Sequence, residues 1–333
     1  MASAKAFTFL PLGAIIQEFK VNGKNIVQGF PTAELYKQYN SPYFGETIGR
    51  IANRVANAKI DDLNGKSYPL VANNAPNSLH GGLNGWGKRE FEGPSSVERN
   101  GKDATFFKYV SKDGEEGYPG TVEFRVWYVQ ETQEIDDTKQ EVLHIEYEAE
   151  LVGDEVQETA INVTNHSYFN LTGGPSIAGT EVTLSTSKYL VVDESLIPKG
   201  PIEDFPGVKA NTEFTLGEQE PDIDHCFVVN TDAKNIPIDT RSQPLNKLAS
   251  FYHPESKIHL EVSSTEPTFQ FYTGKHIDVP VVEGIAARKS RSGFCVEPAR
   301  YVNAINVPEQ KSQMLLKKGE KYGCKIVYRG WQV

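Results

Sequence analysis

The chain has 333 residues, of which 38% are hydrophobic and 23% are charged, so it can bury a substantial core and does not have a disordered composition. Its 34 basic and 44 acidic residues give a formal net charge of −10. Such a surface repels phosphate backbones and anionic lipid, which excludes nucleic acid and membrane surfaces as expected partners but leaves neutral ligands open.

The N-terminal stretch, MASAKAFTFLPLGAII, shows no targeting signal. It holds one lysine, and Pro11 and Gly13 interrupt its apolar character. We therefore expect neither a signal peptide nor a membrane span.

Two tight hairpin turns are predicted at Asn22–Gly23 and Asn64–Gly65, because both residues of an Asn-Gly pair readily adopt positive φ. Between and after these turns lie two polar segments. GRIANRVAN (49–57) places Asn53 beside Arg54, whose planar fork of donors suits sugar oxygens or a carboxylate, although a surface ion pair is the simpler alternative.

The second polar segment, NNAPNSLHGGLNGWG (73–87), is rich in glycine and asparagine and predicts a loop. His80 lies in it, followed by two glycines, so the loop could present an imidazole close to backbone. An ordinary loop histidine is the alternative.

Alternation with a period of two follows. In LHIEYEAEL (143–151) the apolar residues point one way, and His144 and three glutamates point towards solvent. KIHLEV (257–262) repeats this pattern. Three further strands are expected from β-branched and aromatic residues: VEFRVWYV (122–129), TEVTLST (180–186) and CKIVYRGW (324–331).

The charged runs QETQEIDDTKQE (130–141) and GEQEPDID (217–224) predict loops, and no stretch has a sustained helical period. Without a linker, a repeat or a low-complexity tract, we expect residues 1–333 to form one large antiparallel all-β domain.

The segment INVTNHSYFNLTGG (161–174) is the most informative. On a strand, His166 and Tyr168 would share a face with Asn162, Thr164 and Asn170. This face carries no charged residue, unlike the solvent faces above, which suits a groove for a neutral, hydroxyl-rich ligand. A buried histidine satisfied within a sheet is the alternative.

A second candidate is Glu297 in GFCVEPARYVNAIN (293–306). It follows an apolar run and precedes Pro298, which is expected to end the pairing of the strand. Desolvation would raise its pKa and make it a better base. An exposed edge glutamate, or an ion pair with Arg300, is the alternative. Asp224 in PDIDHCF and Gln270 in PTFQFYTG carry no signal singly.

Several chemistries lack their usual motifs. There is no GxGxxG, HExxH or GxSxG, and Ile60 stands where the first glycine of a P-loop would be. Cys226, Cys295 and Cys324 are odd in number and widely spaced, so we expect packed free thiols, neither disulfides nor a metal site.

Read together, these segments resemble the aldose 1-epimerase (galactose mutarotase) family from about residue 10 to the C-terminus. The anchors occur in the order of the family: GRIANR, PNSLHGG, DGEEGYPG, TNHSYFNL, YLVVDESLIPKG, Asp224-His225, FQFYTG and GFCVEP. The resemblance implies a β-supersandwich with a sugar cleft on a sheet face, and no metal or organic cofactor.

The resemblance also implies site roles. His166 matches the acid of the family and Glu297 its base, while the sugar-binding positions match Asn53, Arg54, His80, Asp224 and Gln270, with Tyr168 beside them. The base would take the proton of the anomeric hydroxyl while protonated His166 protonates the ring oxygen, which opens the ring.

The chain departs from the family after Glu297, where Pro298-Ala299-Arg300 replaces a Thr-Gln-like step. Arg300 could favour a phosphorylated sugar, so a hexose-6-phosphate epimerase is an alternative to an enzyme acting on galactose, glucose or xylose. A non-catalytic carbohydrate-binding module is another. We expect a cytoplasmic protein, because Asn162, Asn165 and Asn170 begin glycosylation triplets and glycans on them would block the site. We also expect a monomer or weak homodimer.

Overall fold

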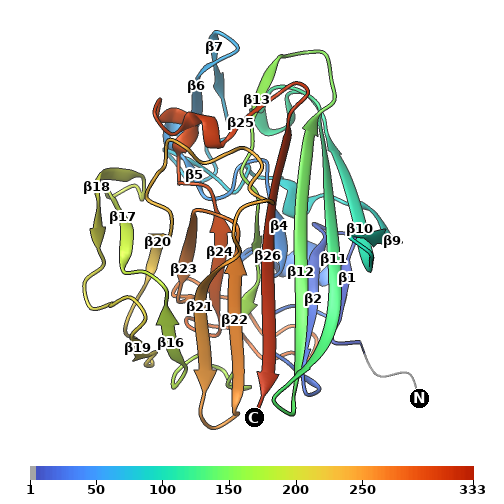
Figure 1. Cartoon of the computed structure of the whole chain (residues 1–333), viewed down its shortest axis with the longest axis vertical. Helices are drawn as coiled ribbons and strands as arrows, with labels where there is room; N and C mark the ends of the chain where they lie inside the picture. Colours follow the sequence, from blue (N-terminus) through green and yellow to red (C-terminus); the bar gives the residue numbers. More distant parts are fainter. Residues whose placement is uncertain (1–4) are drawn as a thin grey trace.

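The computed structural model describes residues 5–333, and its dominant element is a nine-stranded antiparallel sheet of mostly long strands (Figure 1). In spatial order its strands are β19 (Glu213–Thr215), β16 (Glu181–Leu184), β21 (Asn246–His253), β22 (Ile258–Ser264), β26 (Lys321–Gln332), β12 (Thr138–Leu151), β11 (Val122–Ile135), β10 (Lys102–Ser111) and β9 (Glu92–Arg99).

A second, six-stranded sheet packs beside this large sheet. It consists of β15 (Tyr168–Phe169), β24 (Phe294–Ala299), β23 (Thr268–Tyr272), β20 (Asp224–Val228), β17 (Lys188–Val192) and β18 (Pro198–Asp204). Its strands β17 and β18 stand at the left edge of Figure 1. A three-stranded sheet is formed by β1 (Phe7–Leu10), β2 (Ile15–Val21) and β3 (Lys24–Asn25).

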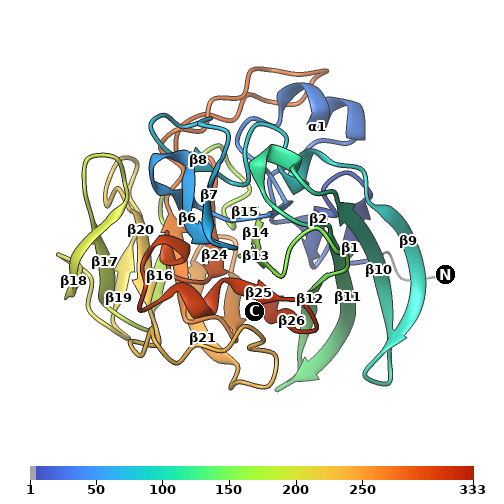
Figure 2. The same cartoon turned by 90° about the horizontal axis from the view of Figure 1, so that it is seen from above.

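Small elements surround the sheets. The strand pairs are β4 (Glu46–Ile48) with β14 (Thr164–His166), β5 (Arg54–Val55) with β8 (Ser78–Leu79), β6 (Lys59–Leu63) with β7 (Lys66–Pro69), and β13 (Glu158–Ala160) with β25 (Leu315–Lys317). The helices are α1 (Ala33–Tyr39) and the 3₁₀ turns Ala56–Ala58, Trp86–Lys88, Glu115–Gly117, Ala304–Asn306 and Lys311–Gln313. Figure 2 shows α1 and β8 on the side of the molecule opposite to β21, β12 and β11.

The core lies between the sheets. Side chains of β12 at Leu143, Ile145 and Tyr147 belong to one buried cluster with Phe294 of β24. The rings of Phe251 and Phe294 stack with centroids 4.3 Å apart and join the two large sheets. The all-β sandwich expected from the sequence is therefore confirmed.

Most predicted elements occur where expected. The turns at Asn22–Gly23 and Asn64–Gly65 have both residues at positive φ and connect β2 to β3 and β6 to β7. All five predicted strands are present. The only α-helix in residues 5–333 spans seven residues, so the expectation of little helix is also confirmed. No helix in this part of the chain is long and apolar enough to cross a membrane.

The prediction of a loop at 130–141 is wrong. β11 and β12 continue through this run and pair up to Ile135 and Thr138, and the turn is confined to Asp136 and Asp137, both at positive φ. The polar and charged side chains of the two strands pair with one another instead of marking a loop, as where the hydroxyl of Thr132 donates to Oε2 of Glu141 at 2.7 Å.

Pro298 does not end the pairing of β24, which continues to Ala299 with Pro298 opposite Phe269. The strand β15 pairs only with Phe294 and Cys295 on the other side of β24. In the described residues no strand pairs with Pro298 on the side of β15, so the missing N–H of Pro298 costs no hydrogen bond of a ladder there.

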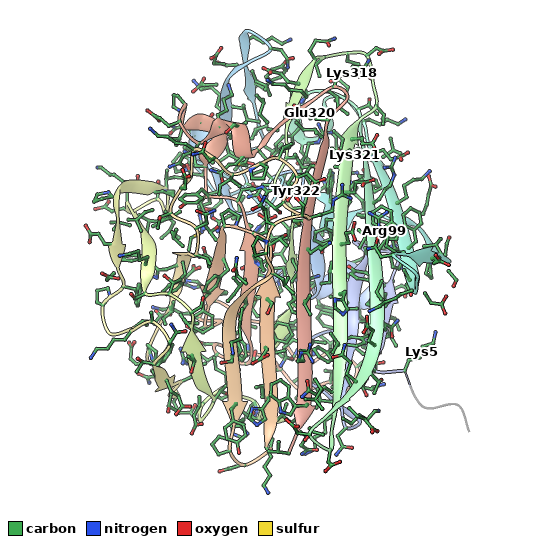
Figure 3. The ribbon with its side chains drawn as sticks, in the orientation of Figure 1. Lys5, Arg99, Lys318, Glu320, Lys321 and Tyr322 are labelled. Atoms are coloured by element: carbon green, nitrogen blue, oxygen red, sulfur yellow. The ribbon has the colours of Figure 1, made fainter. Side chains whose placement is uncertain are left out.

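The outward face of β12 is also less exposed than the alternation predicts. Glu146 and Glu148 are 8% and 5% exposed, because arginines from neighbouring segments cover them. Arg99 pairs with Glu146, and Arg125 and Arg241 pair with Glu148. Figure 3 shows Arg99 and Lys321 among the side chains over these strands. This face is an ion-pair layer.

Candidate active site

A cleft of about 200 Å³ lies on the face of the six-stranded sheet that is turned away from the core. Its walls come from β5, β8, β14, β15, β20, β23 and β24 and from two loops. The lining residues are Ser41, Pro42, Tyr43, Asn53, Arg54, Leu79, His80, His166, Tyr168, Asp224, Gln270, Tyr272, His276, Ile277 and Glu297.

Strand alternation explains which side chains reach the cleft. On β24, Phe294 and Val296 point into the core, so Glu297 points to the other face. On β23, Phe269 and Phe271 are in the core, and Gln270 lies directly opposite Glu297 in the register. Each apolar–polar alternation along these strands thus places one polar group in the cleft.

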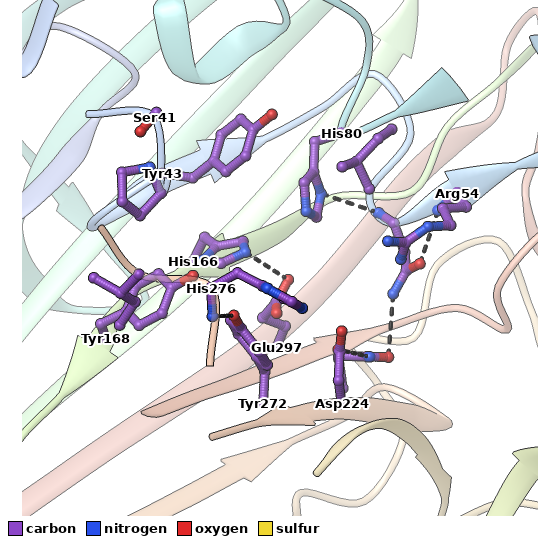
Figure 4. A pocket seen from close by; sticks show the side chains of 15 residues that line it. Ser41, Tyr43, Arg54, His80, His166, Tyr168, Asp224, Tyr272, His276 and Glu297 are labelled. Carbon is purple, nitrogen blue, oxygen red and sulfur yellow. Dashed lines mark hydrogen bonds and ion pairs between the residues drawn. The ribbon is translucent and has the colours of Figure 1, made fainter. Parts of the chain in front are cut away.

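His166 and Glu297 meet in the middle of the cleft. The His166 Nε2 atom lies 3.4 Å from an Oε atom of Glu297, and the two residues are only 3% and 4% exposed. Figure 4 shows this pair between two groups of side chains, with Tyr43 and Tyr168 on the side of His166, and Arg54 and Asp224 on the side of Glu297.

Burial sets the protonation of this pair. It lowers the pKa of His166 to about 3, and the positive charge of Lys88 acts in the same direction. Burial and the charge of Asp224 hold the pKa of Glu297 well above its ordinary value of 4.5, and Arg54 offsets this only in part. Burial therefore favours a neutral imidazole beside a protonated carboxyl.

A chain of hydrogen bonds crosses one wall of the cleft. The backbone N–H of Asn53 donates to Nδ1 of His80 at 3.2 Å, and Nδ2 of Asn53 donates to Oε1 of Gln270 at 3.1 Å. Nε2 of Gln270 donates to Oδ1 of Asp224 at 2.6 Å. These contacts hold four polar side chains in fixed orientations before any ligand binds.

Three lining residues have left-handed backbone conformations: Tyr43 (φ 69°), Asn53 (φ 59°) and His80 (φ 50°). Such values are uncommon outside glycine and cluster at functional sites. Gly81 after His80 also has a positive φ, of 83°, and a Cβ there would in addition lie 2.0 Å from the carbonyl oxygen of Gly49.

Donor atoms of His80, His166 and Glu297 lie within 4.8 Å of one another, which is the arrangement of a possible metal site. However, Nδ1 of His80 already accepts the N–H of Asn53. A neutral His80 ring then carries its proton on Nε2 and offers no free lone pair to a metal. His80 is better suited to donate a hydrogen bond into the cleft.

All eight residues proposed from the sequence lie together in this cleft. The shared-face prediction for 161–174 is only partly right, because Asn162, Thr164 and Asn170 are buried away from the cleft, and only His166 and Tyr168 reach it. Two further lining residues, Tyr43 and His276, come from loops and were not predicted from the sequence. The Ser41-Pro42-Tyr43 turn and a histidine soon after Gly274 were the available signals.

The expectation that Arg300 acts near the sugar is wrong. Its side chain is fully buried, and both Oε atoms of Glu266 accept from its Nη1 at 2.9 Å. It also donates to the backbone carbonyls of Gln313 and Ile238. Arg300 is thus neither the partner of Glu297 nor a lining residue of the cleft.

Comparisons with known proteins agree with this geometry. The sequence model of aldose 1-epimerase matches residues 3–329. The chain is 37% identical over 317 residues to the bifunctional protein gal10 of Schizosaccharomyces pombe, covering 94% of this chain but 42% of that protein. The chain therefore spans less than half the length of this relative and of the GAL10 proteins of Kluyveromyces lactis and Pachysolen tannophilus.

A shorter relative is covered almost throughout. Galactose mutarotase of Sus scrofa is 38% identical over 312 residues, which is 92% of this chain and 84% of that protein. The crystal structure of a GalM/aldose epimerase homologue from C. elegans superposes with a TM-score of 0.81 at 25% identity, covering 98% of this chain and 95% of that one. With the family's sequence pattern, its fold and a cleft built on its anchors all present, the chain belongs to the aldose 1-epimerase family.

Proposed function

We propose that this protein is a cofactor-independent isomerase that interconverts the α and β anomers of free aldoses. The observation that carries the proposal is the buried pair of His166 and Glu297, whose nitrogen and oxygen lie 3.4 Å apart in a polar cleft. Proton exchange at a hemiacetal requires a base and an acid, and a carboxyl and an imidazole can fill these two roles.

The proposed cycle needs one proton shared by the two groups. In the productive form the proton is on Nε2 of His166 and Glu297 is ionised. Glu297 takes the proton of the anomeric hydroxyl, the ring C–O bond breaks, and His166 gives its proton to the ring oxygen. Rotation about C1–C2 exposes the other face of the aldehyde, and both transfers reverse as the ring closes.

The two protonation states of the pair are related by this cycle. After ring opening, His166 is neutral and Glu297 is protonated, which is the state that burial favours. Moving one proton from Glu297 to His166 restores the productive form without exchange with solvent. Hydroxyl groups of a bound sugar would stabilise that charged form by hydrogen bonding.

The two sides of the cleft suggest how the sugar lies. With the anomeric hydroxyl at Glu297 and the ring oxygen at His166, C2 faces Asp224 and Arg54, and C5 with its substituent faces Tyr43 and Tyr168 (Figure 4). The polar wall would hold hydroxyl groups, and the aromatic wall would contact C–H groups. The name of the pig relative, galactose mutarotase, supports galactose as one substrate.

The hexose-6-phosphate alternative loses its main support, because Arg300 pairs with Glu266 away from the cleft. Arg54 is the one arginine among the lining residues, and it lies on the side of Asp224, away from the expected C5 substituent. Free aldoses are therefore the favoured substrates.

We also propose that the protein acts in the cytoplasm, with one chain sufficient for the site. The three glycosylation triplets begin with asparagines that are no more than 6% exposed, and the three cysteines are buried free thiols. All lining residues of the cleft come from a single chain.

Polarimetry tests the proposal. The protein should speed the mutarotation of freshly dissolved α-galactose or α-glucose well above the rate in buffer. Sugar binding without such acceleration would favour the carbohydrate-binding module, and acceleration restricted to glucose 6-phosphate would favour the phosphate alternative.

A further inference from the structure

Two side chains of one strand flank the imidazole of His166. Cys295 and Glu297 are alternate residues of β24, so their side chains point to the same face about 6.6 Å apart along the strand. Nε2 of His166 lies 3.4 Å from Glu297, and Nδ1 lies 3.5 Å from the Sγ atom of Cys295. The spacing of the strand thus fits one imidazole ring between a carboxyl and a thiol.

We propose that Cys295 is a positioning residue for the acid–base step, with its sulfur accepting a hydrogen bond from Nδ1–H of His166 and so keeping Nε2 as the nitrogen that exchanges protons. The proposal rests on the proposed function, because it assigns the role of Cys295 within that reaction. Cys295 itself would not touch the sugar, since it does not line the cleft.

The proton transfers of the proposed cycle determine whether Nδ1 of His166 donates to the sulfur of Cys295 or accepts from it. Nε2 gives a proton to the ring oxygen during ring opening and recovers it during closure, so it must be able to lose its hydrogen. The proton on Nδ1 then stays in place throughout, and the same sulfur accepts it in both states. If the thiol instead donated to Nδ1, a neutral ring would carry its proton on Nε2 and could not accept one during closure.

A thiol at this position differs from a carboxylate in its effect on the ring. A carboxylate beside Nδ1 would stabilise the imidazolium. Sulfur is a neutral and weak acceptor, so it orients the ring without stabilising the charged form. Burial raises the pKa of Cys295 well above its ordinary value, so the thiol stays neutral. The rings of Tyr168 and His80, each with its centroid 5.1 Å from that of His166, add no charge at Nδ1.

The buried environment makes this single contact matter. His166 is 3% exposed and Cys295 is fully buried, so water cannot replace the sulfur as a partner of Nδ1 without rearrangement. Glu297 contacts the other ring nitrogen, Nε2, and the backbone carbonyl of His166 accepts from the N–H of Gly45 at 3.0 Å, so Cys295 is the side chain that contacts Nδ1. Removal of the thiol should therefore loosen the choice between the two ring tautomers.

The test is ¹⁵N NMR of the His166 ring in the full-length chain, combined with turnover. In the wild type, Nδ1 should be protonated and Nε2 unprotonated. Cys295→Ala should give a mixture of tautomers and lower kcat roughly 5- to 10-fold, the rate equivalent of one neutral hydrogen bond, with little change in KM. Cys295→Ser should restore both the tautomer and most of kcat.

Cys324→Ala is the matched control, because Cys324 is an equally buried thiol on β26, outside the cleft. It should leave the His166 spectrum and kcat unchanged. A wild-type ring protonated on Nε2 would overturn the proposal, as would an unchanged tautomer in Cys295→Ala. The wild-type spectrum needs neither turnover nor a variant, so failure of the proposed reaction remains distinguishable from failure of this hydrogen bond.

Discussion

Two buried glutamates, Glu297 in the cleft and Glu148 on the outer face of the nine-stranded sheet, have nearly equal exposure, 4% and 5%. Around Glu148, burial acts to raise the pKa, but hydrogen bonds from Arg241 and Arg125 outweigh it and lower the pKa. Around Glu297 no cation donates a hydrogen bond within the described residues, and burial raises the pKa.

The difference shows that burial alone does not distinguish a structural carboxyl from a reactive one. Glu148 remains ionised because its arginines supply donors, so it holds the sheet face together and has no proton to exchange. Glu297 faces a neutral imidazole and can hold or release a proton. At similar exposure, the arginine donors around Glu148 and the neutral, enclosed surroundings of Glu297 determine which chemistry each carboxyl can perform.

The largest effect is expected from Glu297→Gln, which keeps the shape but removes the proton acceptor. We expect kcat to fall roughly 10³-fold, within the range for loss of one acid–base group, while sugar binding is retained. Glu148→Gln is the matched control and should keep kcat within about 2-fold, since Glu148 lies on the outer face of the nine-stranded sheet and does not line the cleft. Polarimetry and calorimetric sugar titration measure both, and equal losses in the two variants would contradict the comparison.

The pH dependence of turnover should reflect a pair that works with one proton. Activity should fall on the acidic side as a second proton enters His166, whose pKa is lowered to about 3, and on the alkaline side as the last proton leaves Glu297, whose pKa is raised. The measurement is kcat/KM by polarimetry, corrected for spontaneous mutarotation. An acidic limb centred at the ordinary carboxyl value of 4.5 would show that burial does not shift the pair.

Loss of Gln270 should weaken binding more than chemistry. Gln270→Ala breaks the contacts to both Asn53 and Asp224, so the polar wall loses its fixed orientation. We expect KM to rise about 10-fold and kcat to change less than about 3-fold, in line with one or two hydrogen bonds. A large fall in kcat at unchanged KM would mean that Gln270 acts on the reacting atoms.

The smallest effects are opposite shifts in thermal stability. A raised pKa means that folded Glu297 keeps its proton while the unfolded chain ionises, so its contribution to stability falls as pH rises through the folded pKa. Glu297→Gln should therefore raise Tm by a few degrees at pH 8 and have no such effect near pH 4. Glu148→Gln should lower Tm at pH 8, because a lowered pKa stabilises the fold above the unfolded value. Shifts of the same sign would refute the contrast.

Alternation along the strands was sufficient to predict the sheets, because inward and outward residues differ in polarity. It failed at 130–141, where charged and amide side chains pair across β11 and β12 and hide the period. It also treated Glu146 and Glu148 as solvated, because the covering arginines, Arg99 and Arg241, come from other segments.

The site was predictable only in part, because its contacts also depend on partners from distant segments of the chain. Residue types and the family resemblance named His166 and Glu297, but their contact depends on the pairing of β15 with β24, which no local pattern encodes. The sequence also placed Arg300 near the sugar, since chain proximity to Glu297 does not reveal the buried partner Glu266. Tyr43 and His276 lie on loops, where no period exists to show direction.

Magnetisation transfer between the α and β anomeric protons of galactose at equilibrium tests the account most directly, because it reports ring opening without a starting excess of either anomer. We predict transfer with the wild type and with Glu148→Gln, and none above buffer with Glu297→Gln. Transfer that persists in Glu297→Gln, or is lost in Glu148→Gln, would contradict the assignment of the proton exchange to the pair of Glu297 and His166.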